Sequence, residues 1–364
     1  MICYNYNALR KDINLMRENT RQVKVGNIIL GGQNHVYIQS MCNIKTSKVK
    51  QVVKQILELE ELGCEIIRVS IFDEKDAYSI KRIKEQIHIP LVADIHFNPH
   101  LALLAIENGA DKIRLNPGNI TDEEDIKKII ELAKEKGIAI RIGVNSGSAA
   151  NDKVGSDFKV DASYMVNKLD EYIKIFEKYD FHNLVLALKS SSPLQTIEAY
   201  TLASKKYNYP LHIGITEASV KDVGLIRSSV GLAPLLLNGI GDTIRISLSD
   251  DPKEEIIGAK RLLHDCGLYP NYYTIISCPT CGRTQANTKS ISNKVMKLLE
   301  KYKKNIVVAV MGCVVNGIGE GKQADIGIAC GGNKKYIIFK QGKIVRRSDL
   351  SSLLQDFEEE LQKI

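Results

Sequence analysis

The feature that most constrains the fold is a short apolar segment, a polar turn and an amphipathic helix, which recur together from Val36 onward. Helical spacing of apolar residues is clear at 48–62, 122–136, 165–179 and 252–265. Eight such units over about 230 residues match the size and rhythm of a (β/α)8 barrel. A doubly wound open sheet seldom needs eight consecutive units, and no GxGxxG follows the first strand. We therefore predict an α/β fold with a TIM barrel, its strands at 36–41, 65–71, 91–95, 112–115, 138–144, 184–188, 211–215 and 243–248.

A second, smaller unit is predicted after the barrel. A chain of 364 residues exceeds what one hydrophobic core usually serves, and helical periodicity ends near Cys266. We expect a barrel domain at 1–266, opened by a hairpin at 21–34, and a small α/β domain at 267–364. Within the second domain the pattern predicts strands at 273–277, 306–311, 325–329 and 335–339, and helices at 289–301 and 348–362.

Basic side chains gather at the predicted carboxyl ends of the barrel strands, where barrel proteins place their sites. A single arginine at a strand end is usually solvated or salt-bridged. Four arginines and a lysine aimed at one mouth would repel one another unless an anion lay between them. Guanidinium forks suit phosphate oxygens, so a diphosphate is the simplest ligand. The predicted anion-binding residues are Arg68, Arg114, Arg141, Lys189 and Arg245.

The same strand ends carry groups that can orient a substrate or move a proton. Asp94, His96 and Glu217 supply two carboxylates and an imidazole, although His96 also fits a structural histidine. Polar neighbours at the same level are Asn116, Asn145, Thr216 and Ser247. The chain has no Walker loop, no Ser/His/Asp order and no HExxH motif.

The other candidate site lies in the second unit, where the sequences CPTCGRT at 278–284 and MGCVVNGIGE at 311–320 bring three cysteines. Cys278 and Cys281 can converge on one metal, and Cys313 can close on the same point after a helix and a strand. Three thiolates among glycines suit an iron–sulfur cluster with one special iron. A structural zinc site and a redox CxxC pair remain alternatives, whereas the CxxxCxxC spacing of radical-SAM enzymes is absent.

Composition narrows the class further. The net charge of +7, from 50 Lys+Arg against 43 Asp+Glu, is too mild for nucleic-acid binding but suits an anionic small molecule. Neither a secretory signal nor a run of transmembrane length is visible, so we expect no membrane association. Eight cysteines without such a signal indicate a reducing, cytoplasmic setting.

These motifs together resemble a known family. QSM at 39–41, ADIHF at 93–97, KIRLNPGN at 112–119, RIGVNSGS at 141–148, GITEA at 214–218, GDTIRISL at 241–248 and the two cysteine motifs are similar to those of 4-hydroxy-3-methylbut-2-enyl diphosphate synthases of the bacterial two-domain form. The resemblance covers nearly the whole chain from about residue 21. It departs at Cys42, where a threonine-like residue is expected after QSM.

The resemblance implies a [4Fe-4S] cluster on Cys278, Cys281, Cys313 and Glu320. Cys330 is a rival fourth ligand, but four thiolates would leave no easily opened iron. The implied substrate is 2-C-methyl-D-erythritol 2,4-cyclodiphosphate, opened and dehydroxylated by two electrons in isoprenoid biosynthesis. Because no nicotinamide or flavin fingerprint is present, flavodoxin or ferredoxin is the expected electron donor. The alternative of another class is a zinc-stabilised barrel that binds a phosphate ligand without redox activity.

We also expect a homodimer with sites shared between chains. The last barrel helix, at 252–265, runs about 20 Å back from the mouth, so the second domain starts at the opposite face. A connector from 266 to 277 spans about 35 Å only when fully extended. A head-to-tail dimer, in which each cluster domain caps the partner's barrel, needs no such stretch, and the resemblance implies the same.

Overall fold

The computed structural model describes residues 16–115, 120, 122–149, 160–279, 281–302, 304–313, 319, 321–332 and 335–364. These residues belong to two compact units, one ending at Leu268 and the other running from Tyr269 to Ile364. Within the described ranges, no helix combines the length and apolar character that a membrane crossing requires.

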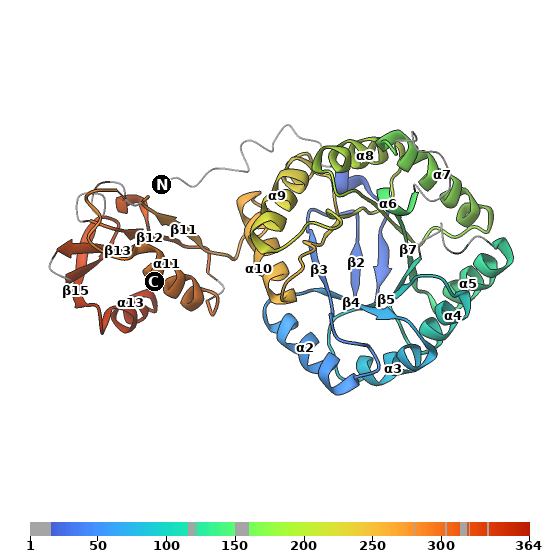
Figure 1. Ribbon diagram of the computed structural model, residues 1–364, viewed down its shortest axis with the longest axis horizontal. Helices are drawn as coiled ribbons and strands as arrows, with labels where there is room; N and C mark the ends of the chain where they lie inside the picture. Colours follow the sequence, from blue (N-terminus) through green and yellow to red (C-terminus); the bar gives the residue numbers. More distant parts are fainter. Residues whose placement is uncertain are drawn as a thin grey trace. The chain divides into compact units, whose positions relative to one another are not determined.

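The first unit is a closed barrel of eight parallel strands, as the sequence predicts (Figure 1). Neighbours in the sheet follow the order β8-β7-β6-β5-β4-β3-β10-β9. A parallel bridge between Leu186 and Leu211 joins the two ends and closes the ring. The strands are β3 (Tyr37–Met41), β4 (Ile66–Ile71), β5 (Leu91–Ile95), β6 (Lys112–Leu115), β7 (Ala139–Asn145), β8 (Leu184–Lys189), β9 (His212–Ile213) and β10 (Thr243–Ile244).

Amphipathic helices form the outer ring seen in Figure 1. Several begin at an aspartate whose carboxylate accepts a hydrogen bond from a backbone N–H of the first turn, as at Asp73, Asp122 and Asp251. Their apolar sides pack inward on the strands. The helices are α2 (Val49–Glu61), α3 (Glu74–Lys84), α4 (Pro99–Glu107), α5 (Glu123–Lys136), α6 (Ser146–Ala149), α7 (Ala162–Lys178), α8 (Pro193–Lys206), α9 (Lys221–Leu237) and α10 (Pro252–Asp265).

A short hairpin covers the amino-terminal end of the barrel. It follows η1 (Met16–Asn19) and consists of β1 (Val23–Val25) and β2 (Ile28–Leu30), with Gly26 at φ +58° in the turn. Its apolar side chains pack against buried residues at the start of four strands, namely Ile66, Val92, Ala139 and Val185. The hairpin therefore covers apolar residues at this end of the barrel, although two buried polar residues, Gln39 and Lys112, lie at the same register level.

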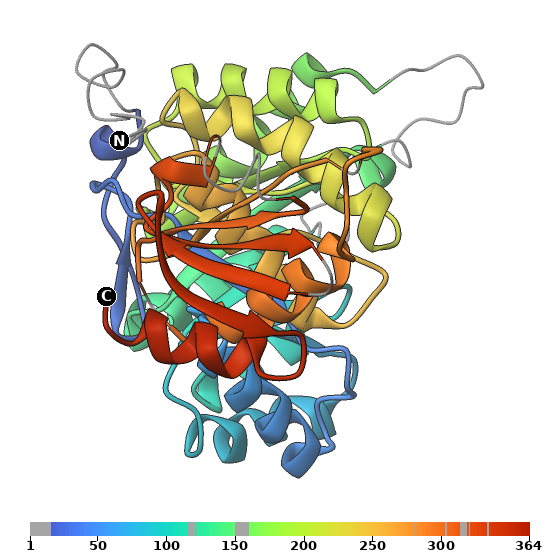
Figure 2. The same ribbon diagram turned by 90° about the vertical axis from the view of Figure 1, so that its left-hand side faces the viewer.

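The second unit is a five-stranded sheet in the order β11-β12-β13-β14-β15, drawn in orange and red in Figure 2. The first three strands are parallel and the last two run antiparallel to their neighbours. Its elements are β11 (Thr274–Ser277), α11 (Thr288–Leu299), β12 (Val307–Met311), η3 (Gly321–Gln323), β13 (Ile326–Gly332), β14 (Lys335–Lys340), β15 (Lys343–Asp349) and α13 (Leu353–Leu361).

Several predicted element boundaries were wrong, two of them by four residues or more. The closing helix expected at 348–362 begins only at Leu353, because Gln341 and Gly342 both take positive φ values and turn the chain into the β14–β15 hairpin. The strand expected at 243–248 leaves the sheet after Ile244, and the N–H of Leu248 donates to the Glu255 carboxylate instead.

Candidate functional site

The barrel mouth is built around Asp94. The side chains of Asp94, Arg114 and Arg141 lie at one level, because strands β5, β6 and β7 pair these three positions in register. Arg114 Nη1 donates to Asp94 Oδ1 at 3.3 Å, and Arg68 Nε lies 3.8 Å from Oδ2. His96 Nε2 lies 3.2 Å from the same Oδ2. Three residues predicted from sequence thus contact the Asp94 carboxylate, and a fourth, Arg141, lies beside Arg114.

Charge balance keeps this carboxylate ionised. Burial alone would raise the pKa of Asp94, but Arg68, His96, Arg114 and Arg141 together hold it well below its usual range. Burial also lowers the pKa of Arg68, to about 10, against the opposing effect of Asp94. One buried carboxylate therefore faces three guanidinium groups, which leaves positive charge for a ligand.

A second carboxylate, Glu255 of α10, holds Arg245. Its oxygens accept from Arg245 Nε at 3.3 Å and Nη2 at 3.1 Å, and from Ser40 Oγ at 2.7 Å. Met41 Sδ lies 2.8 Å from Arg68 Nη2 and 3.7 Å from Arg245 Nη1, so it stands between the two arginines. Sequence analysis missed Glu255, because a glutamate in the first turn of an amphipathic helix normally faces water.

Lys189 lies deep in the barrel beside His212. Its Nζ is 3.1 Å from His212 Nε2, and His212 Nδ1 is 2.7 Å from the Thr243 hydroxyl. Burial and the neighbouring cations hold the pKa of both Lys189 and His212 well below their usual values. Gly214 gives the lysine room, because a Cβ there would lie 2.9 Å from Nζ. His212 was missed because it sits within an apolar strand pattern.

Several buried polar atoms beneath the mouth have no hydrogen-bond partner within the described residues. Arg141 is 2% exposed, and its Nε and Nη1 are unpaired. Lys112 Nζ and both polar atoms of the Gln39 amide also lack a hydrogen-bond partner. Leaving such groups unsatisfied is costly, so their presence fits a bound anion or ordered water inside the barrel.

The remaining predicted residues occupy the rim. Asn145, Thr216 and Ser247 are half-buried, and Asn145 pairs in register with Lys189. Glu217 is exposed and has a φ of +53°. This left-handed backbone conformation is unfavourable for residues other than glycine and often occurs at functional loops. Asn116, which was also predicted, lies outside the described residues.

The cysteine loops meet at the ends of neighbouring parallel strands. Cys278 follows β11, and Cys313 lies two residues beyond β12. The N–H of Gly312 donates to Cys278 Sγ at 3.0 Å, and the N–H of Gln285 donates to the Gly312 carbonyl at 3.0 Å. These bonds tie the CxxC turn to the segment that carries Cys313, and an N–H aimed at sulfur is typical of iron–sulfur sites.

Cys281 is the exposed member of the set, whereas Cys278 and Cys313 are buried. Hydrogen bonds from the backbone and side chain of Arg283, and from the Thr284 hydroxyl, lower the pKa of Cys281. A lowered pKa favours the thiolate, which is the form that binds metal. The donor set therefore suits a thiolate-held cluster.

Over the described ranges, no three His, Cys, Asp or Glu side chains already stand close enough to hold a metal ion. Glu320, the predicted fourth ligand, lies outside the described residues. Cys330 is on the face of the sheet that α11 and α13 cover, in an apolar cluster with Val295 and Phe357, whereas Cys278 belongs to the cluster on the opposite face. The fold thus separates Cys330 from the CxxC turn.

The fold and its polar residues define a class of two-unit proteins: a (β/α)8 barrel with a cationic mouth, followed by an α/β unit with a CxxC turn. The chain belongs to the GcpE family: the GcpE TIM-barrel domain matches residues 20–260 and the GcpE protein C-terminal domain matches residues 274–363. This confirms the family resemblance.

Curated relatives match almost end to end. The 4-hydroxy-3-methylbut-2-en-1-yl diphosphate synthase (flavodoxin) of Caldanaerobacter subterraneus subsp. tengcongensis is 50% identical over 349 residues, covering 96% of this chain and 98% of the relative. A protein of the same name from Lysinibacillus sphaericus is 48% identical, covering 96% and 94%.

Solved structures with low sequence identity share the barrel fold. Dihydropteroate synthase of Stenotrophomonas maltophilia aligns with a TM-score of 0.50 and 15% identity, over 68% of this chain and 98% of that one. The 3-dehydroquinate dehydratase of Geobacillus kaustophilus aligns with a TM-score of 0.50 and 14% identity, over 70% and 99%.

Proposed function

We propose that the chain converts 2-C-methyl-D-erythritol 2,4-cyclodiphosphate to 4-hydroxy-3-methylbut-2-enyl diphosphate, in isoprenoid precursor biosynthesis. The observation that carries this proposal is that Asp94, Arg114 and Arg141 lie side by side on adjacent strands, in a chain of the GcpE family. Among the described residues, Arg141 Nε and Nη1 have no partner, so they are available to a ligand. Two electrons enter, the ring opens at the bond between C2 and its phosphate oxygen, and the C3 hydroxyl leaves as water after taking a proton.

The guanidinium groups of Arg68, Arg114, Arg141 and Arg245, with Lys189, bind the diphosphate. Asp94 and Glu255 hold three of these arginines in place before the substrate arrives, so little side-chain entropy is lost on binding. Asn116, Asn145, Thr216 and Ser247 contact the polar substituents of the sugar-derived chain.

Glu217 and the Asp94–His96 pair handle the proton and the hydroxyl group. Glu217 is exposed at the rim, where its carboxyl group can deliver a proton to the leaving hydroxyl. His96, fixed by its contact with Asp94, orients the substrate from the neighbouring strand.

Cys278, Cys281, Cys313 and Glu320 hold a [4Fe-4S] cluster. When bound, it supplies single electrons and an iron that acts as a Lewis acid toward a substrate oxygen. The chain's own contribution is the hydrogen bond from Gly312 N–H to Cys278 Sγ and the fold that keeps Cys330 away. A carboxylate in place of a fourth thiolate leaves one iron accessible.

The partners are an electron carrier and a second copy of the chain. The relatives named above carry flavodoxin in their names, which favours flavodoxin over ferredoxin as the donor. Helix α10 has 14 residues and runs away from the mouth, so the barrel unit ends about 20 Å from the anion site. We therefore favour a homodimer in which each barrel uses the partner's cluster. A reducing, cytoplasmic location completes the proposal, because thiolate metal ligands persist in such a compartment.

Anaerobic purification tests the proposal directly. We expect a brown protein with visible absorption, about four iron and four sulfide per chain, and turnover of the cyclodiphosphate with dithionite and methyl viologen. A colourless protein that contains zinc and binds the cyclodiphosphate without turnover would support the zinc-stabilised binding protein instead.

A further inference from the structure

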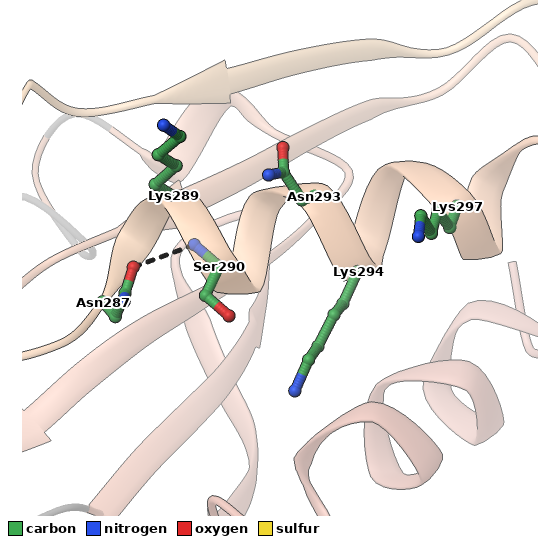
Figure 3. A pocket seen from close by; sticks show the side chains of 6 residues that line it. All are labelled: Asn287, Lys289, Ser290, Asn293, Lys294 and Lys297. Carbon is green, nitrogen blue, oxygen red and sulfur yellow. Dashed lines mark hydrogen bonds between the residues drawn. The ribbon is translucent and has the colours of Figure 1, made fainter.

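Helix α11 presents a basic face to solvent. Its sequence, TKSISNKVMKLL, contains Lys289, Lys294 and Lys297 and no acidic residue, and all three lysines are exposed. Figure 3 shows Lys289 and Asn293 projecting from one side of the helix, Lys297 further along it, and Lys294 projecting from the other side. Together with Asn287 and Ser290 they line a shallow hollow of about 320 Å³. We call Lys289, Lys294 and Lys297 the lysine face.

No acidic side chain among the described residues forms an ion pair with this lysine face. Four acids of the same unit pair elsewhere, with basic residues on the strands and at the C-terminus, and Glu300 accepts from the hydroxyls of Tyr272 and Tyr273. Asp356 and Glu359 bind Arg346, Glu360 binds Lys340 and Lys363, and Asp349 binds Lys335. Among the described residues of this unit, no ion pair balances the lysines of α11, so their charge can attract an acidic partner.

The first turn of α11, which carries Lys289, is next to the cysteine site. A Cβ at Gly312 would lie 3.1 Å from Thr288 Cγ2 and 3.0 Å from Thr284 Cγ2, so the first turn of α11 packs against the residue before Cys313. Cys281 is the exposed thiol of the set, and Arg283, also exposed, hydrogen-bonds to it. Exposed basic side chains therefore occur both at the cysteine site, as Arg283, and on the helix that starts beside it, as Lys289.

We infer that the lysine face, with Arg283, is the docking surface for an acidic electron-carrier protein of the flavodoxin type. This inference rests on the proposed function and names the surface at which its electrons enter. Electron-transfer complexes are small, and electrostatic complementarity steers them more than apolar burial does. The exposed Cys281 edge lets the carrier's flavin approach the cluster, while the lysines orient the carrier.

The test compares two charge reversals of equal size. K294E/K297E reverses two charges of the lysine face, and K50E/K54E reverses two exposed lysines on α2 of the barrel unit. We expect K294E/K297E to raise KM for reduced flavodoxin about tenfold with little change in kcat. Turnover driven by dithionite and methyl viologen, which need no docking surface, stays within about twofold of wild type. K50E/K54E behaves as wild type in both assays.

Salt provides a second readout. The wild-type KM for flavodoxin should rise with sodium chloride, and the K294E/K297E value should respond much less. The inference is wrong if KM for flavodoxin is unchanged in K294E/K297E, or if it rises as much in K50E/K54E. It is also wrong if the viologen-driven turnover of K294E/K297E falls in parallel. A change in oligomeric state of K294E/K297E would assign the face to a copy of the chain instead.

Failure of the proposed function gives a different result. A wild-type protein that does not turn over the cyclodiphosphate even with viologen would disprove the reaction. Calorimetric titration with oxidised flavodoxin still decides the docking surface in that case. Binding that is lost in K294E/K297E and kept in K50E/K54E supports the inference. The inference is overturned if K294E/K297E binds flavodoxin as tightly as wild type does, or if wild type does not bind it.

Discussion

Arg114 Nη1 donates a hydrogen bond to Asp94 Oδ1 at 3.3 Å, and both side chains are buried inside the barrel. This contact fixes an arginine whose register neighbour, Arg141, has two nitrogens without a partner among the described residues. The barrel therefore holds a charged, desolvated surface that is arranged before any ligand arrives, as expected for an anion site.

Replacing the arginines should weaken substrate binding without loss of the cluster. For Arg114→Ala or Arg141→Ala we expect a loss of about 1.5–3 kcal/mol in binding free energy for each charge-assisted contact removed. Titration with the cyclodiphosphate measures it, and visible absorption reports the cluster. Unchanged affinity in both variants would make these arginines structural.

Gly214→Ala should disturb the site through packing. The new Cβ would lie 2.7 Å from the Arg245 carbonyl oxygen and 2.9 Å from Lys189 Nζ, so the free energy of unfolding should fall by about 1–3 kcal/mol and substrate affinity should fall too. Gly143→Ala is the control, because its nearest atom, Arg114 Nε, would be 3.6 Å away. Denaturant unfolding and substrate titration compare them, and equal losses in both variants contradict the argument.

The fourth cluster ligand can be assigned by two substitutions. Cys330 is 1% exposed on the helix-covered face of its sheet, so Cys330→Ala should keep iron content and turnover with a small loss of stability. Glu320→Ala should keep much of the iron but lose most activity. Iron and sulfide analysis with the turnover assay decides this. A cluster that disappears only in Cys330→Ala would reverse the assignment.

Shared sites predict recovery of activity when two inactive variants are mixed. Cys313→Ser keeps a sound barrel and Arg114→Ala keeps a sound cluster. After subunit exchange about half of the dimers are mixed, and each has one intact site, so activity should approach about a quarter of wild type. Exchange is verified with differently tagged chains. Background activity after verified exchange would mean that each cluster serves its own barrel.

Asp242 should make stability depend on pH. It is buried at the amino-terminal end of β10, where its carboxylate accepts from Leu211 N–H at 2.7 Å and Thr20 Oγ1 at 3.0 Å. Burial raises its pKa to about 6 despite these bonds. Between about pH 4 and 6 the folded chain therefore keeps a proton that the unfolded chain releases, and stability falls as pH rises through this range.

Asp242→Asn removes this titration. The wild-type free energy of unfolding, measured relative to this variant, should fall by an amount on the order of 3 kcal/mol from pH 4 to pH 6. Above pH 6 the difference should stay constant. Urea unfolding at several pH values measures it, and a difference that does not vary with pH would exclude the raised pKa.

The sequence by itself determined the barrel and most of its mouth. Periodicity located the strands, and parallel strands in a closed barrel must bring their carboxyl ends together, so Arg68, Asp94 and Arg114 were predictable as neighbours. The CxxC turn and Cys313 were predictable for a similar reason, because β11 and β12 are adjacent parallel strands.

Only the tertiary structure decided which groups balance the charges. Glu255 comes from a helix and His212 from the middle of an apolar strand pattern, and neither position signals a role until side chains from different strands and helices are brought together. The face of the sheet on which Cys330 lies was likewise undetermined, since strand periodicity gives alternation but not which side the helices cover. Local patterns specify elements, whereas burial and pairing depend on contacts between residues far apart in the chain.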